Sequence, residues 1–238
     1  MLGSKVKDVA IWMPLWILLG ILFLSSKPKM ASTFNLQKVS VSPLLRIGHG
    51  VSGLLVSAYV AFHLFNHLFS LFGESAHAQV MEMGRIVYRS PLIEPLLVLA
   101  LLFQVVTGGI LVWKWSAQKT DFYRLFQLAT GVFLSIFILS HLNAVFIFAR
   151  TFAGIETDWS FATGDPVGML YDPWSVRLIP HYAFGVFFVL AHLGSGLRVV
   201  LLAHAAAERK ANNVLFATAS FAFLISLTIM LGLNGVRF

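Results

Sequence analysis

The sequence predicts an all-α integral membrane protein: a bundle of five core transmembrane helices, with a short hydrophobic N-terminal segment as a candidate sixth. Two observations predict this fold. Hydrophobic residues make up 58% of the 238 residues and charged residues only 11%, whereas soluble domains carry about 25% charged residues. In addition, five apolar segments reach the length of about 20 residues that a helix needs to cross a bilayer.

The N-terminal extension, residues 1–43, contains the candidate sixth helix. Residues 10–24 are apolar, but this stretch is shorter than the roughly 20 residues of a full span, and Pro14 interrupts it. A short span, an interfacial helix and an uncleaved signal-like segment all fit this pattern. A polar linker over 25–43 leads to the transmembrane bundle, which we assign to residues 44–238.

The five predicted spans cover about 45–72, 92–113, 123–149, 179–204 and 213–233, with Pro, Gly and charged residues in the breaks. In lipid the backbone must satisfy its own hydrogen bonds, and spans of this length favour helices. If the first span begins in the cytoplasm, ten of the 17 Lys and Arg residues lie on the inner side and seven on the outer side. This asymmetry predicts the orientation of the bundle. We expect the membrane to be a bacterial inner membrane.

Composition also excludes several functions. The chain has no cysteine, which rules out disulfides, thiolate metal sites and cysteine-bound iron–sulfur clusters in this chain. The net charge of +7 is not a sign of nucleic-acid binding, because membrane proteins gather Lys and Arg in cytoplasmic loops. The predicted environment is therefore the lipid membrane, with no nucleic acid partner.

Two histidines lie at matching depths in different spans. His63 follows Arg46 by 17 residues, and His141 follows Arg124 by the same number. At about 1.5 Å per helical residue, both imidazoles lie about 25 Å from the inner edge. A histidine inside a membrane is costly without a partner, so this pair predicts the two axial ligands of a haem iron. The alternative is two core histidines bonded to backbone or serine.

A second depth match joins Gln104 and His192, each 13 residues into a descending span, with a glycine four residues further on. These residues are candidates for a second haem site or a quinone site. His192 would form a hydrogen bond to Gln104, bind a quinone carbonyl, or ligate a haem together with a different residue. His49 near the inner edge and His181 near the outer edge do not match its depth.

Three segments carry a family resemblance: 46–53 (RIGHGVSG), Thr130-Gly131 ahead of His141, and 192–197 (HLGSGL). With these segments, residues from about 43 to 233 resemble the cytochrome b membrane anchor of succinate dehydrogenase and fumarate reductase, in its single-subunit, five-helix, two-haem form. The resemblance implies that His63 and His141 ligate the outer haem and that His192 supplies half of the inner pair.

Gln104 stands where the family's second-helix histidine would be. Because imidazole suits iron far better than an amide, we expect one haem b and leave a second open. His67, one turn beyond His63, is expected either to bond a haem propionate or to bind the iron in place of His63. The other expected propionate partners are Arg150, Arg177 and His181, since cations bind carboxylates by charge-assisted hydrogen bonds.

A bis-histidine haem has no open coordination position and therefore transfers electrons. The resemblance implies a flavoprotein carrying FAD and an iron–sulfur subunit docked on the cytoplasmic face, with membrane quinone as the substrate. The quinone candidates are the Gln104/His192 region and the outer side near Glu82 and Arg85. No catalytic residue is assigned, so the chain is a non-catalytic or quinone-reactive subunit. The alternatives are a stand-alone cytochrome b, a haem-free quinone-binding anchor and a non-redox channel or transporter.

Overall fold

The computed structural model describes residues 14, 17, 18, 21, 41–116 and 121–238. The chain divides into two units, Met1–Lys38 and Val39–Phe238, and the fold described below is that of the second unit. The predicted short hydrophobic segment at 10–24 and the linker at 25–43 lie almost entirely outside the described residues.

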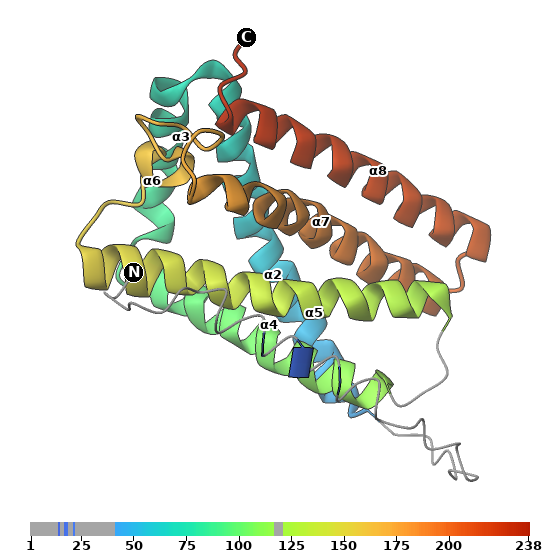
Figure 1. Cartoon of the computed structure of the whole chain (residues 1–238). Coiled ribbons are helices and arrows are strands. Elements are labelled where there is room, and N and C mark those ends of the chain that lie inside the picture. Colours follow the sequence, from blue (N-terminus) through green and yellow to red (C-terminus); the bar gives the residue numbers. More distant parts are fainter. Residues whose placement is uncertain (1–13, 15–16, 19–20, 22–40, 117–120) are drawn as a thin grey trace. The chain divides into compact units, whose positions relative to one another are not determined.

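The described part of the second unit is built from helices (Figure 1). Its long elements are α2 (Pro43–Leu68, extended by a 3-10 turn at Phe69–Phe72), α4 (Ile93–Ser116), α5 (Phe122–Leu142, continued by a π-helix at Asn143–Ala153), α7 (Leu178–Ala203) and α8 (Glu208–Leu233). All five are long and apolar enough to cross a membrane. The five predicted spans and the all-α fold class are thus confirmed.

Local sequence explains where these helices begin. Proline in the first turn of α2 costs no hydrogen bond, because the first N–H groups of a helix have no partner within it. Asp121 caps α5 by accepting a hydrogen bond from the backbone N–H of Arg124 at 2.7 Å. The helix ends therefore coincide with the proline and charged residues that separate the apolar segments.

The five long helices pack as a ring. Within it α2 contacts α4, α4 contacts α5, α5 contacts α7, α7 contacts α8, and α8 returns to α2. Among the described residues, α2 has no extended contact with α5 or α7. Side chains from α2 that point inward can therefore meet side chains from α5 and α7 across the middle of the ring.

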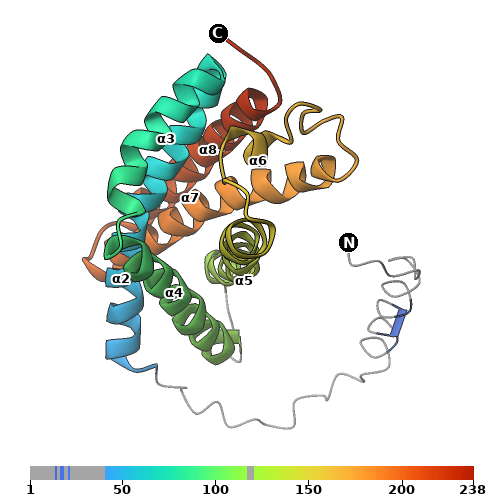
Figure 2. The same ribbon diagram turned by 90° about the vertical axis from the view of Figure 1, so that its left-hand side faces the viewer.

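The predicted outer end of the ring carries two shorter helices that the sequence did not predict, α3 (Glu74–Tyr88) and α6 (Trp159–Thr163). Figure 2 shows α3 beside the second half of α2. Trp159, from the long loop before α7, is buried in a core cluster with Leu64 of α2 and Ile229 of α8. The loop is thus packed against the ends of the helices.

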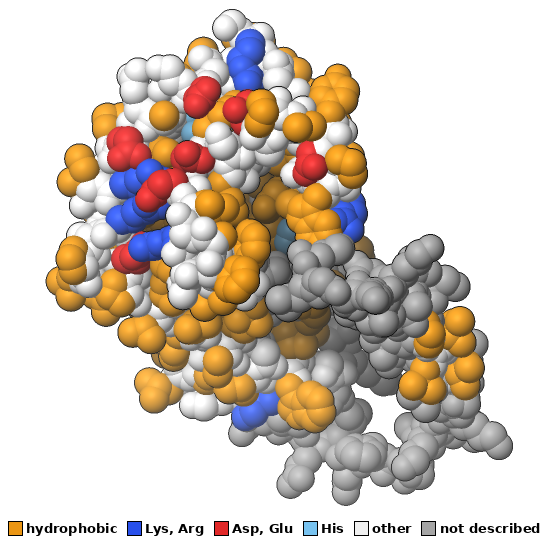
Figure 3. Space-filling view, turned by 60° about the vertical axis from the view of Figure 1, so that its left-hand side comes forward, with side chains coloured by type: hydrophobic (Ala, Val, Ile, Leu, Met, Phe, Trp, Pro, Cys, Tyr) orange, Lys and Arg blue, Asp and Glu red, His pale blue; other side chains and the backbone are white. Residues whose placement is uncertain are grey.

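Large apolar side chains cover much of the outside of the bundle. Leu54, Leu99 and Ile136 are each more than half exposed. Figure 3 shows apolar side chains over much of one face, a group of acidic and basic side chains at its upper left, and further charged side chains elsewhere on it. In water such a surface would be strongly unfavourable. Facing lipid, it is the expected surface of an integral membrane protein.

Candidate functional site

The two histidines predicted to share one depth meet across the ring. The ring centroids of His63 on α2 and His141 on α5 lie 6.1 Å apart, and the ring planes are inclined by 67°. A metal–imidazole bond is about 2 Å long, so two imidazoles on opposite sides of one ion have centroids about 6 Å apart. The spacing of this pair is therefore compatible with two imidazoles bound on opposite sides of one iron ion.

Aromatic rings flank both imidazoles. Tyr59, one turn before His63, stacks on it with centroids 5.6 Å apart. Phe137, one turn before His141, stacks on it at 5.8 Å with planes only 6° apart. These side chains restrict the imidazole orientations and exclude water. In the described part of the chain, no three His, Asp or Glu side chains converge to hold a free metal ion. Two imidazoles are the axial donors of a bis-histidine haem.

His67 and His77 extend the cluster toward α3. The His67 centroid lies 4.7 Å from that of His63, and its Nδ1 is 3.4 Å from Nε2 of His77. His77 is 2% exposed, and the Asn66 amide lies 3.3 Å from the same nitrogen. Burial, with a smaller effect from the Arg85 charge, lowers the pKa of His77 below its ordinary value. His77 is therefore held as a neutral imidazole behind the His63–His141 pair.

The three other predicted propionate partners have partners of their own. Arg150 pairs with Glu94 at 2.6 Å, the Arg177 guanidinium lies 3.7 Å above the Trp174 ring, and His181 is 3.2 Å from the Ser140 hydroxyl. The His181 ring also packs on Phe137, with centroids 4.9 Å apart, and Phe137 stacks on His141. Arg150 and Arg177 thus have structural contacts that would have to be exchanged for a carboxylate.

Arg85 lies beside the histidines of α2 and α3, although the sequence suggested it only as part of an outer quinone site and not as a propionate partner. The Arg85 side chain on α3 is 13% exposed, interacts electrostatically with His77, and has a buried Nε without a hydrogen-bond partner. Its NH1 pairs with Glu82 at 2.7 Å. The pairing places both residues of the predicted outer quinone region on one face of α3. Without knowing that residues 74–88 are helical, the sequence gives no reason to direct Arg85 inward.

Gln104 and His192, predicted to lie at one depth, bond to different residues. The Gln104 amide donates to the His49 carbonyl oxygen at 2.8 Å and to the Ser52 hydroxyl at 2.5 Å. His192 Nδ1 lies 3.0 Å from Oγ1 of Thr130 on α5. Gln104 therefore holds α4 against α2, and the hydrogen bond considered between Gln104 and His192 is replaced by these two contacts.

His49 on α2 also contacts α4. Its Nδ1 lies 2.8 Å from Oγ1 of Thr107 on α4. The two threonines that contact His49 and His192 share a sequence feature. Each is followed by glycine, as Thr107-Gly108 in the predicted second span and Thr130-Gly131 in the third.

The comparisons with known proteins identify no relative. No family model matches the chain, no curated protein matches it, and no solved structure matches it. The arrangement of its histidines is therefore the basis for a functional interpretation.

Proposed function

We propose that this protein is the membrane anchor and electron-transfer subunit of a succinate:quinone or quinol:fumarate oxidoreductase, with haem b held between His63 and His141. The observation that carries the proposal is the 6.1 Å spacing of these two imidazoles on α2 and α5, which have no extended contact in the described residues. Such spacing across a ring of apolar helices suits a flat macrocycle bound from both sides.

The haem would supply a one-electron redox centre, and the chain would control its surroundings. His63 and His141 would fill both axial positions, which leaves no place for oxygen to bind. Tyr59 and Phe137 would orient the two imidazoles and exclude water. Burial and axial ligand type are the features by which a protein sets a haem potential, and this chain provides both.

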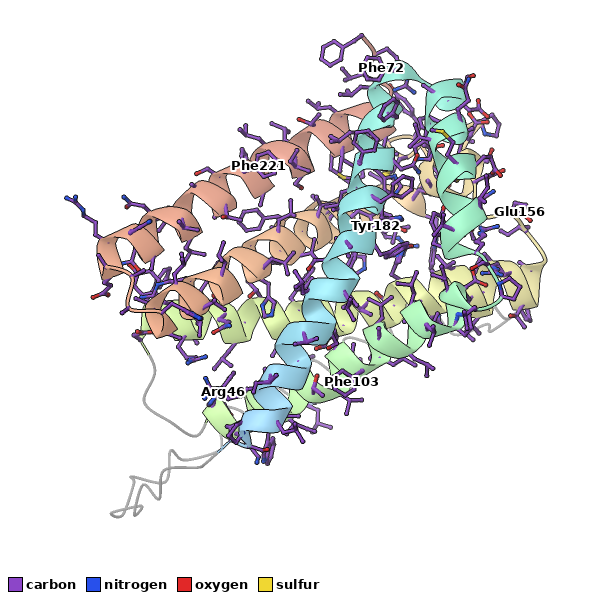
Figure 4. All side chains as sticks on the ribbon, turned by 180° about the vertical axis from the view of Figure 1, so that it is seen from behind. Arg46, Phe72, Phe103, Glu156, Tyr182 and Phe221 are labelled. Carbon is purple, nitrogen blue, oxygen red and sulfur yellow. The ribbon has the colours of Figure 1, made fainter. Side chains whose placement is uncertain are left out.

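The basic inner end supports docking of an iron–sulfur subunit, with FAD on a further flavoprotein subunit. Figure 4 shows Arg46 at the first turn of α2, at the same end of that helix as Phe103 of α4. Arg46 and Arg198 both interact electrostatically with Arg124. This cluster lies on the predicted cytoplasmic side and would attract an acidic partner. The polar Gln104–Ser52–His192 region and the Glu82–Arg85 face remain the two quinone candidates.

The test is a dithionite-reduced minus oxidised spectrum of the purified protein, with haem counted by pyridine haemochrome. We expect a b-type spectrum, with haem lost in His63→Ala and in His141→Ala. The matched control is His204→Ala, because His204 is exposed at the end of α7. A colourless wild-type protein would refute the cytochrome reading and leave the haem-free anchor or the channel.

The partner assignment needs its own measurement. We expect flavin, iron–sulfur clusters and succinate-dependent quinone reduction to purify with a tagged chain under mild detergent. Haem without any co-purifying flavoprotein would instead favour the stand-alone cytochrome b.

A further inference from the structure

The predicted inner end of the bundle holds a cavity of about 530 Å³, at the ends of α4 and α7 and the starts of α5 and α8. Pockets that bind small molecules span about 300–1,000 Å³. The charged groups that line it are two carboxylates and two guanidinium groups, those of Asp121, Glu208, Arg124 and Arg198. Because these charges balance, the cavity suits a ligand that carries both signs of charge better than a simple anion.

Arg198 brings a buried positive charge to this cavity. The residue is 7% exposed, and its guanidinium lies 3.8 Å above the Tyr123 ring. Its Nε donates to the Asn212 side chain at 2.7 Å, whereas a Glu208 oxygen lies 3.8 Å from a terminal nitrogen, too far for a hydrogen bond. A guanidinium has five N–H donors. Arg198 therefore keeps donors for an acceptor in the cavity, and its planar fork matches a phosphate.

Helix α5 lines the cavity with three different polar groups in order. Asp121 caps the helix, Arg124 follows three residues later with its guanidinium 4.4 Å above the Trp115 ring, and its NH1 donates to Oε1 of Gln127 at 2.9 Å. Because the Gln127 oxygen accepts this bond, its NH₂ group remains as a donor. From the predicted inner edge the order is carboxylate, guanidinium, amide, in steps of about 4.5 Å.

Helices α7 and α8 give the opposite wall the same order. Glu208, at the start of α8, has a side chain that is 72% exposed. Arg198 lies deeper, and Ser195, 2% exposed, lies three residues deeper again on α7. Residues three apart are neighbours on a helix surface. Both walls therefore carry a carboxylate nearest the predicted cytoplasm, an arginine next and an uncharged donor deepest.

A glycerophospholipid with an ethanolamine headgroup has complementary groups in the same order. Its ammonium lies nearest to water, its phosphate next and its ester carbonyls deepest. Carboxylates pair with an ammonium and guanidinium groups with a phosphate, through charge-assisted hydrogen bonds, while amide and hydroxyl donors suit ester carbonyls. Basic pockets between transmembrane helices on the cytoplasmic side are known to bind lipid headgroups. Aromatic rings such as those of Trp115 and Tyr123 are typical of this depth.

We propose that this cavity binds the headgroup of a lipid that carries a phosphodiester and a primary ammonium, as phosphatidylethanolamine does. Arg124 and Arg198 bind the phosphate, and Asp121 and Glu208 bind the ammonium. The inference goes beyond the proposed function and does not depend on it, since the site uses none of the residues around the proposed haem. Arg46 does not line the cavity and is exposed, so it stays available to an acidic partner subunit.

The test measures lipid binding to the full-length, delipidated protein in detergent, by native mass spectrometry and by thermal unfolding. The probes are phosphatidylethanolamine, phosphatidylcholine, phosphatidylglycerol and sodium phosphate. We expect one phosphatidylethanolamine to be retained per chain and to raise the melting temperature most. The choline headgroup has no N–H to donate, the glycerol headgroup has no cation, and free phosphate has no ammonium or esters. Each of these should therefore bind about tenfold more weakly, as for the loss of a hydrogen bond to a charged group.

Variants separate the two halves of the site. Arg198→Gln should weaken retention of phosphatidylethanolamine about tenfold, by the same loss. Arg209→Gln is the matched control, because Arg209 is exposed in the first turn of α8 and does not line the cavity. In Asp121→Asn/Glu208→Gln, phosphatidylglycerol should bind as well as phosphatidylethanolamine. Asparagine still caps α5 and Glu208 is exposed, so this double variant tests the site even if Arg198→Gln does not fold.

Equal binding of the three lipids by the wild type, or wild-type retention in Arg198→Gln, would overturn the inference. So would a preference for phosphatidylglycerol that the double variant keeps, or stabilisation by sodium phosphate equal to that by phosphatidylethanolamine, which would indicate a site for free anions. Haem content of the same samples should not differ between the variants and the wild type. A colourless wild-type protein that still selects phosphatidylethanolamine would refute the proposed function and support this inference.

Discussion

Arg150, in the π-helix that continues α5, forms a two-pronged ion pair with Glu94 in the first turn of α4, at 2.6 and 3.1 Å. The side chains are 34% and 23% exposed, so solvent screens the pair only in part. We predict that Arg150→Gln lowers the free energy of unfolding by about 1 kcal/mol, as for a partly exposed pair of good geometry. Thermal unfolding in detergent would measure it.

The double variant Glu94→Gln/Arg150→Gln is the control. Because the two side chains stabilise each other, it should lose little more than either single variant. Haem content should stay at the wild-type level in all three, since Arg150 is engaged by Glu94. Loss of haem in Arg150→Gln alone would restore the expectation that Arg150 holds a propionate.

The buried His77 should make the stability of the protein depend on pH. Burial first, and the Arg85 charge second, lower its pKa in the folded protein below the ordinary value of 6.5, so the unfolded chain takes up a proton at a higher pH than the folded one. The stability from neutral His77 is thus fully present above pH 6.5 and is lost as pH falls below it. One proton changes the free energy of unfolding by at most about 1.4 kcal/mol per pH unit.

The measurement compares chemical unfolding of the wild type and His77→Phe between pH 7.5 and about pH 5, a range that brackets the ordinary histidine pKa. The variant should be less stable at neutral pH, because it leaves Asn66 and His67 without their partner. Its free energy of unfolding should fall less steeply than that of the wild type as the pH is lowered. The same dependence on pH in both proteins would mean that the pKa of His77 does not differ between the folded and unfolded chain.

The close approach of α7 and α8 depends on Gly194. A Cβ there would lie 2.8 Å from both Cβ and Cγ2 of Thr218, whose hydroxyl is bonded to the Val214 carbonyl at 2.8 Å. The threonine cannot easily move away, so we predict that Gly194→Ala lowers the free energy of unfolding by about 1–3 kcal/mol.

Gly196→Ala is the matched control on the same helix, because nothing lies within 4 Å of a Cβ at that position. Alanine is the better helix former by about 1 kcal/mol, so this variant should equal or exceed the wild type in melting temperature. Equal effects of the two substitutions would show that helix propensity, rather than packing of α7 on α8, determines the response.

The sequence predicted all five spans because hydrophobic length alone determines which segments can cross a bilayer. It did not predict α3, since Glu74–Tyr88 is not apolar enough to cross a membrane and is ordered by packing on α2. Depth counting paired His63 with His141, whose ring centroids lie 6.1 Å apart. It also paired Gln104 with His192, but these side chains bond to different residues, because the depth of a residue does not determine which way its side chain points.

Two histidines of α2, His63 and His67, are candidates for the iron ligand opposite His141. His67 lies one turn beyond His63, but its nearest ring partners are His63 and His77, at 4.7 and 5.3 Å. Its Nδ1 also lies 3.4 Å from His77. It is therefore held toward α3, while His63 faces His141. We predict that His67→Ala keeps the outer haem and that His63→Ala loses it.

Haem counts and low-temperature electron paramagnetic resonance of both variants would test this assignment. Bis-imidazole ligation should persist in His67→Ala, with at most a shifted potential, because a polar neighbour of an axial ligand has been removed. The opposite result, haem kept without His63 and lost without His67, would move the ligand by one turn. The 6.1 Å approach of His63 to His141 would then be ordinary aromatic packing, and the haem would lie closer to α3 and the buried Arg85.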